Sequence, residues 1–183
     1  MSNANLTTQK LEKQVGVRLP DVLKKEINKY ANKESKSSSQ FVNDMLQTYF
    51  ENHLPAHVLN ALKVTSYSND SLTERKLIIK FIKADYFEPS KELLGIYNNL
   101  ETDIGRKEFV FMLLKQSING YTNFTHDPIY QDRGNKIVKY GIYLSNDIYN
   151  YLDKISEITG LTKRSIVEKA FCQYKQKKNE KVV

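Results

Sequence analysis

Residues 14–20 read Gln-Val-Gly-Val-Arg-Leu-Pro (QVGVRLP) and carry the alternating pattern of a β-strand. Apolar side chains at positions 15, 17 and 19 alternate with Gln14, Gly16 and Arg18, so a strand here buries one face and exposes the other. Pro20 ends the alternation and opens a helical pattern. Because one short strand is not stable alone, this segment requires a second strand as its partner.

An internal repeat supplies this pattern a second time. Shifting the chain by 125 residues aligns Gly16 with Gly141 and Leu19 with Leu144 without a gap. The alignment continues through two helical patterns and keeps the apolar class at nearly every position: Val17 with Ile142, Leu23 with Ile148, Ile27 with Leu152, Tyr30 with Ile155, Phe41 with Ile166, Val42 with Val167 and Tyr49 with Tyr174. Each copy therefore predicts a strand followed by two helices.

The boundaries between the two helices also agree with a repeat. In the first copy, Ser37 followed by Gln40 predicts a capping box at the start of the second helix. In the second copy, Gly160 can end the first helix in the left-handed conformation, and Thr162 takes the place of Ser37.

A strand, a Leu-Pro or Leu-Ser junction, a helix, a short turn and a helix led by Ser or Thr resemble the ribbon-helix-helix DNA-binding proteins of the Arc/MetJ type. The resemblance covers residues 12–52 and 136–177. It implies that two such units pair their strands into an antiparallel ribbon that enters the major groove, with four helices beneath it. We therefore expect a mainly α fold with short β-ribbons, in which tandem ribbon-helix-helix units are joined by linkers.

The rest of the chain divides around these units. The expected boundaries are a flexible arm at 1–11, an N-terminal unit at 12–52, a linker at 53–74, a central segment at 75–120, a linker at 121–135 and a C-terminal unit at 136–178. In the central segment, residues 76–82 (KLIIKFI) suggest a strand, Ser90 a helix cap and the residues after Gly105 a further helix. Two interpretations remain open, a degenerate third ribbon-helix-helix unit and a helical spacer with one strand.

The resemblance also implies which residues meet DNA. The positions that read base edges fall on Gln14, Gly16, Arg18, Lys139, Gly141 and Tyr143. The positions that hold phosphates, at the starts of the second helices, fall on Ser37, Ser38, Ser39, Thr162, Lys163 and Arg164. Arginine can bind guanine, and glutamine adenine, with two hydrogen bonds each.

Each assignment has an alternative. An outward Arg18 also discourages aggregation between strand edges, and Ser37 also serves as an ordinary helix cap. Both copies have glycine where the family usually has a polar side chain. Either the backbone approaches the floor of the groove there, or the central position reads nothing.

Charge and cysteine content narrow the function. A net charge of +7 and a pI near 9.3 favour a polyanionic partner. Cys172 is the only cysteine, so no internal disulfide and no zinc cluster is expected, and the chain suits a reducing compartment. No apolar run reaches the length of a membrane span, and residues 1–10 lack the pattern of a signal peptide. We expect a cytoplasmic protein with double-stranded DNA as its partner and no cofactor.

Enzyme motifs are missing from the sequence. There is no glycine-rich P-loop and no GxSxG elbow. His53 and His57 are four residues apart and could align as metal ligands on a helix, but solvated positions at a helix end are the favoured interpretation, and His126 lies in a linker. We therefore expect a binding protein with neither a metal nor catalytic residues.

The biological role is inferred by analogy with the family. Several linked units resemble the accessory proteins that mark a transfer origin (oriT) in conjugative DNA transfer, which implies a relaxase or another transfer protein as a partner. A transcriptional repressor, or a plasmid partition or copy-control regulator, is the alternative. We expect the central and C-terminal units to pair within the chain and the N-terminal unit to form a homodimer. The alternatives are pairing of the two terminal copies, or pairing between the C-terminal copies of two molecules, with the central segment as a spacer.

Overall fold

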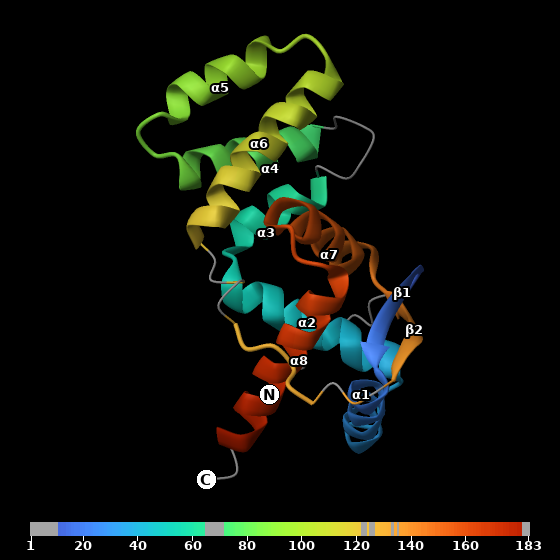
Figure 1. Cartoon of the computed structure of the whole chain (residues 1–183). Helices are drawn as coiled ribbons and strands as arrows, with labels where there is room; N and C mark the ends of the chain where they lie inside the picture. Colours follow the sequence, from blue (N-terminus) through green and yellow to red (C-terminus); the bar gives the residue numbers. More distant parts are fainter. Residues whose placement is uncertain are drawn as a thin grey trace, which may run out of the picture.

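A computed structural model of the chain describes residues 11–64, 72–121, 124, 127–132, 134 and 136–180. Within these residues the chain forms eight helices and one two-stranded sheet (Figure 1). In chain order the elements are β1 (Lys13–Pro20), α1 (Asp21–Lys33), α2 (Ser38–His53), α3 (Ala56–Val64), α4 (Leu72–Asp85), α5 (Ser90–Asn99), α6 (Asp103–Tyr121), β2 (Ile137–Leu144), α7 (Asn146–Thr159) and α8 (Lys163–Glu180).

The two strands of the internal repeat pair with each other. β1 and β2 run antiparallel, and Gly16 lies directly opposite Gly141. These two glycines are also equivalent positions of the repeat. The register and the repeat together therefore define an approximate twofold axis through the glycine pair, which relates β1-α1-α2 to β2-α7-α8.

The inner face of this ribbon covers the main core. The buried strand residues are Val15, Val17, Leu19, Tyr140, Ile142 and Leu144. Each Val, Leu or Ile among them contributes roughly 1.5–3 kcal/mol by leaving water. The second helix of each copy packs on the strand of the other, α2 on β2 and α8 on β1, and α2 and α8 also pack on each other. The two copies thus form one intertwined body.

The helix caps follow the sequence closely. The Ser37 side chain accepts a hydrogen bond from the backbone N–H of Gln40 at 3.1 Å, as a helix N-cap does. The Gln40 side chain does not complete the capping box, and its amide nitrogen donates to Asp44. Gly160 ends α7 with φ of 72°, in the left-handed region.

The expectation of tandem ribbon-helix-helix units is wrong. The described part of the chain is mostly helical and has a single two-stranded sheet, to which each terminal copy contributes one strand. The physical reason is that a strand needs one partner at its pairing edge, and the copy linked in the same chain is present at high effective concentration. With β1 paired to β2, the expected homodimer through the N-terminal unit loses the unpaired strand on which it depended.

The central segment contains no strand among its described residues. Residues 76–82, expected as a strand, lie in α4, where Ile78, Phe81 and Ile82 are buried at helical spacing. The central segment is therefore helical, and a degenerate third unit with its own strand is not formed. Ser90 begins α5, but its hydroxyl donates to the carbonyl of Phe87 rather than capping the helix.

The expected linkers also contain ordered structure. Helix α3 occupies the middle of residues 53–74, with Val58, Leu59, Ala61 and Leu62 buried, and it packs against α4, α6 and α7. It thereby connects the central helices, at the top of Figure 1, to the body that carries the ribbon. In the second linker, Phe124 and Tyr130 are buried.

Two further expectations concern the ends and the membrane. Residues 1–10 of the expected flexible arm, and His126, lie outside the described residues. Over the described ranges, no helix combines the length and the apolar character needed to cross a bilayer.

Candidate nucleic-acid interface

The structure brings the six residues expected to read bases together on one exposed surface, which we call the outer ribbon face. All six are exposed, while their strand neighbours at 15, 17, 140 and 142 are buried. They form three directly opposed pairs: Gln14 with Tyr143, Gly16 with Gly141 and Arg18 with Lys139. Their contact with DNA remains a prediction.

Two like charges meet at one end of the outer ribbon face. Arg18 and Lys139 are directly opposite, and neither forms an ion pair with another residue that the structure describes. Like charges in directly opposed positions destabilise a sheet. A bound polyanion would remove this repulsion, so the pair is better suited to a complex than to the free protein.

The centre of the outer ribbon face is bare. A Cβ atom built on Gly16 would come 3.3 Å from Cε of Lys139, and one on Gly141 would come 3.6 Å from Nε2 of Gln14. Both neighbours are ends of flexible side chains, and neither glycine has a positive φ. The fold therefore does not require glycine at these positions. A glycine inside a strand weakens it and often marks a place where another molecule approaches the backbone.

The start of α2 is fixed to the ribbon. The Ser39 hydroxyl accepts a hydrogen bond from the backbone N–H of Tyr143 at 2.9 Å. The Ser38 hydroxyl donates to Oδ1 of Asn28 at 2.7 Å, and Ser37 caps the helix. All three expected phosphate ligands in the first copy therefore have partners in the chain, and the capping interpretation of Ser37 is confirmed.

The start of α8 repeats this arrangement with charged residues. Thr162 accepts a hydrogen bond from the N–H of Ser165 and caps the helix. Lys163 binds Asp153 at 2.6 Å, and these two residues are the repeat equivalents of Ser38 and Asn28. Nε of Arg164 donates to Glu168 at 2.7 Å. Phosphate binding by Lys163 or Arg164 would have to compete with these carboxylates.

Two residues that the sequence analysis did not single out hold the ribbon on its helices. Asn43 is 1% exposed, and its Oδ1 accepts a hydrogen bond from the backbone N–H of Ser145 at 2.9 Å. The Tyr140 hydroxyl donates to Asn28 at 2.9 Å, and burial raises the pKa of this phenol, which keeps it a donor. The sequence could have indicated Asn43, since it is a polar residue within the apolar face of a helix.

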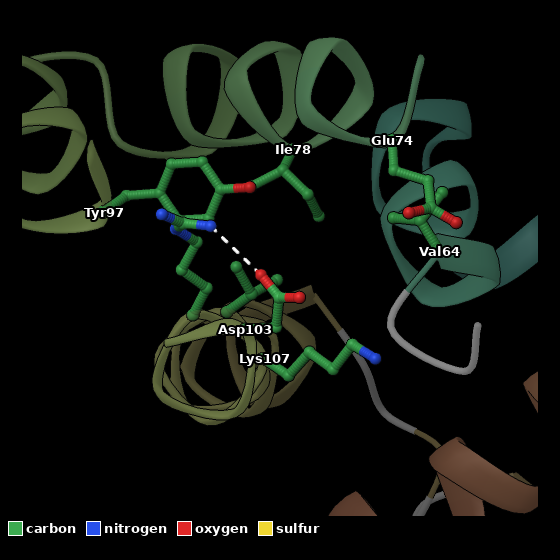
Figure 2. A pocket seen from close by; sticks show the side chains of 8 residues that line it. Val64, Glu74, Ile78, Tyr97, Asp103 and Lys107 are labelled. Carbon is green, nitrogen blue, oxygen red and sulfur yellow. Dashed lines mark hydrogen bonds and ion pairs between the residues drawn. The ribbon is translucent and has the colours of Figure 1, made fainter. Parts of the chain in front are cut away.

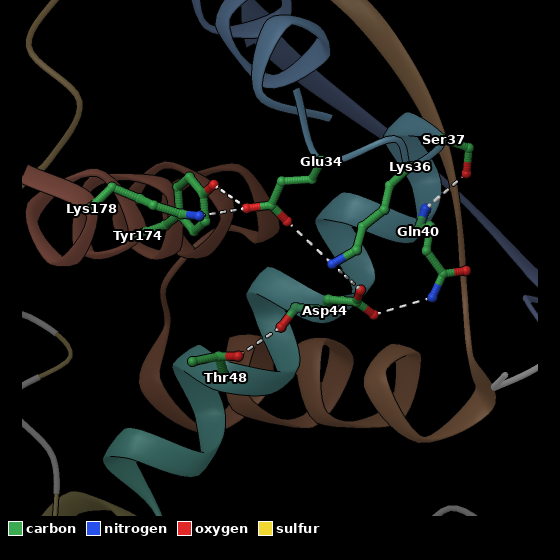
Figure 3. A network of polar contacts seen from close by, with 8 residues as sticks. All are labelled: Glu34, Lys36, Ser37, Gln40, Asp44, Thr48, Tyr174 and Lys178. Atoms are coloured by element: carbon green, nitrogen blue, oxygen red, sulfur yellow. Dashed lines mark hydrogen bonds and ion pairs between the residues drawn. The ribbon is translucent and has the colours of Figure 1, made fainter. Parts of the chain in front are cut away.

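A polar network joins α1, α2 and α8 below the ribbon (Figure 3). Glu34 accepts hydrogen bonds from the Tyr174 hydroxyl at 2.6 Å, from Lys178 at 2.9 Å and from Lys36 at 3.2 Å. These donors, Tyr174 first, lower the pKa of Glu34 from 4.5 to about 2. The network ties the N-terminal copy to the C-terminal one.

His53 and His57 each pair with a different carboxylate. His53 pairs with Asp127, with Nε2 and Oδ2 2.8 Å apart, whereas His57 pairs with Asp85. Their side chains are only 12% and 21% exposed, so the expectation of solvated histidines is wrong. No cluster of three metal-binding side chains occurs among the described residues.

A small cavity lies between α3, α4, α5 and α6, away from the ribbon (Figure 2). Ile78, Tyr97 and Val110 line its apolar side, and an ion pair of Asp103 with Arg106 stands at its edge. Its volume of about 30 Å³ suits a water molecule but not an organic substrate.

Comparison of the chain with protein-family models, curated proteins and solved structures finds no match.

Proposed function

We propose that the protein binds double-stranded DNA by placing the outer ribbon face in the major groove. A two-stranded ribbon is one of the elements that this groove admits. The single observation that carries the proposal is the opposed pair Arg18 and Lys139, exposed and without an ion-pair partner in the described chain, next to a bare glycine centre. The net charge of +7 supports it.

Under this proposal the two terminal copies together make one ribbon-helix-helix body. The support is the order of elements in each copy, the antiparallel ribbon and the four helices α1, α2, α7 and α8 beneath it. The protein would act as a binding module without catalysis, in the cytoplasm, in keeping with its single cysteine.

For the biological role we propose a transfer-origin binding accessory protein that works with a relaxase, and the repressor or partition regulator remains the second candidate. Both follow from the family resemblance alone. Footprinting on the DNA molecule that encodes the protein distinguishes them, because protection falls at a transfer origin in the first case and at a promoter or partition site in the second.

The test of DNA binding compares two double variants that lose the same charge. Arg18→Ala/Lys139→Ala removes the charged pair, and Lys91→Ala/Lys115→Ala removes two exposed lysines from α5 and α6. We measure fluorescence anisotropy with labelled duplexes over a range of salt concentrations. The wild type should bind with a log–log salt slope of about 0.9 for each phosphate contacted. The ribbon variant should lose most of its affinity, and the control little. Equal losses, or no binding of any duplex at low salt, would refute the proposal.

A further inference from the structure

The two ends of the outer ribbon face differ in charge. At one end Arg18 and Lys139 lie opposite each other, and beyond them Lys136 lies beside Asp21, whose backbone N–H donates to the Lys136 carbonyl. At the other end Gln14 lies opposite Tyr143, and neither carries a charge. The nearest charges beyond that end, Lys13 and Glu12, are of opposite sign.

A homodimeric ribbon cannot have this difference. Its twofold axis makes both ends identical, so its preferred DNA site is palindromic. Here the axis is only approximate, because the repeat relates Gln14 to Lys139 and Arg18 to Tyr143. A single chain can therefore present one set of side chains to one half of a site and a second set to the other half.

We propose that the outer ribbon face recognises a non-palindromic duplex in one orientation. This inference rests on the proposed function. The Arg18–Lys139 end lies over G·C, since both side chains donate to O6 and N7 of guanine. The Gln14–Tyr143 end lies over A·T, where Gln14 can bind adenine and the tyrosine ring can contact a thymine methyl group.

The length of the ribbon sets the spacing between the two half-sites. Arg18 lies four positions after Gln14, and a strand rises roughly 3.4 Å per residue, so the two ends are about 14 Å apart. At about 3.4 Å per base pair this corresponds to about four base-pair steps. The bare glycine pair covers the steps between them.

The experiment selects a preferred site and then changes the symmetry of the protein. The full chain first selects from duplexes with a randomised core. Affinities are then measured for the selected site and for the two palindromes made by duplicating either half. We expect an asymmetric motif, bound roughly 5- to 150-fold more tightly than the palindrome that lacks the guanine half, since a bidentate pair discriminates by ~1–3 kcal/mol.

The variant Gln14→Lys/Tyr143→Arg gives both ends the same pair, so it should prefer the palindrome with G·C at both ends. The control Asn98→Arg/Gln116→Lys adds the same charge on exposed positions of α5 and α6 and should keep the wild-type preference. Circular dichroism checks folding. If the first variant does not fold, Arg18→Tyr/Lys139→Gln takes its place and should prefer A·T at both ends.

The outcomes separate the two proposals. A palindromic wild-type motif, or a symmetrised variant that keeps the asymmetric preference, overturns the oriented reading while DNA binding stands. Selection that enriches no sequence from the library, together with no binding of any duplex, overturns the proposed function itself.

Discussion

The pairing of the two copies within one chain predicts the outcome of a crosslinking experiment at the centre of the ribbon. Gly16 and Gly141 are directly opposite in an antiparallel pair. Opposed residues in such a pair have Cα atoms about 4.5 or 5.5 Å apart, and both distances suit a disulfide. The variant Gly16→Cys/Gly141→Cys, made with Cys172→Ser to remove the native thiol, should therefore form a disulfide within each molecule.

The size of the effect follows from the chain between the two positions. They are 125 residues apart, and a closed loop of that length gives about 5 kcal/mol of stabilisation as an upper bound. Strain and residual structure in the unfolded chain reduce this, so we expect ~2–4 kcal/mol and a rise in Tm of about 5–15 °C after oxidation.

Non-reducing gel electrophoresis and thermal melts provide the assay. The oxidised double variant should run as a monomer, and its Tm should fall when a reductant is added. Gly16→Cys alone distinguishes the alternatives, since in a homodimer through the N-terminal strand two copies of position 16 would meet at the axis. A covalent dimer of this single variant, or of the double variant, would refute pairing within the chain.

Three other changes test the interface and its support. Gly16→Ala/Gly141→Ala should leave the free energy of unfolding unchanged or raise it by about 0.5–1 kcal/mol per site, because only flexible side-chain ends are near. The same variant should weaken DNA binding if the backbone approaches the groove. Thermal melts measure the stability, and fluorescence anisotropy measures the binding. Asn43→Ala leaves the buried N–H of Ser145 without its acceptor and should cost ~1–3 kcal/mol in urea denaturation. Glu34→Gln should cost ~1–2 kcal/mol at pH 6. Because the pKa of Glu34 is lowered to about 2 in the folded state, its contribution is present above the ordinary value of 4.5 and is lost as the pH falls toward 2. The difference between wild type and Glu34→Gln should therefore narrow over that range and stay constant above it.

The ribbon could be predicted from the sequence because its signals are local or repetitive. Strict alternation over residues 14–20 determines which side chains point outward, and the 125-residue repeat identifies a second strand of the same kind. The expected pairing of the C-terminal strand with the central segment is wrong, because residues 76–82 form a helix and β2 pairs with β1 instead. Whether the partner belongs to the same molecule is not encoded in either pattern. The same edge-to-edge hydrogen bonds form within a chain and between chains, and the linking segments decide which is favoured.

The central segment was misread because its apolar residues fit two periods. In KLIIKFI, the run from Leu77 to Ile79 followed by Phe81 and Ile82 matches a strand, but also a helix that buries Ile78, Phe81 and Ile82. Short apolar runs of this kind are ambiguous by periodicity alone. Helix α3 was missed for a different reason. Its apolar residues Val58, Leu59 and Leu62 have helical spacing, but the helix is only nine residues long, so the pattern is short.

Partners that are distant in sequence could not be predicted. His53 pairs with Asp127 and His57 with Asp85, and the packing of helices and loops that are distant in sequence brings these residues together. Likewise, Ser38 and Lys163 were expected to bind phosphates because they lie at helix N-termini. In the fold, Asn28 binds Ser38 and Asp153 binds Lys163. A helix start identifies a possible anion site, and only the tertiary structure shows whether a side chain already uses it.

The junction after each strand shows that the two copies obey different local requirements. In a homodimer, every substitution appears in both halves, so a contact that suits one half must suit the other. In this chain, Ser145 needs an acceptor for its N–H and has Asn43, whereas the equivalent residue Pro20 has no N–H to satisfy. The equivalent of Asn43 is Glu168, which binds Arg164 instead. The buried junctions therefore differ where the symmetry of a homodimer would forbid it, and the same covalent linkage allows the two ends of the outer ribbon face to differ.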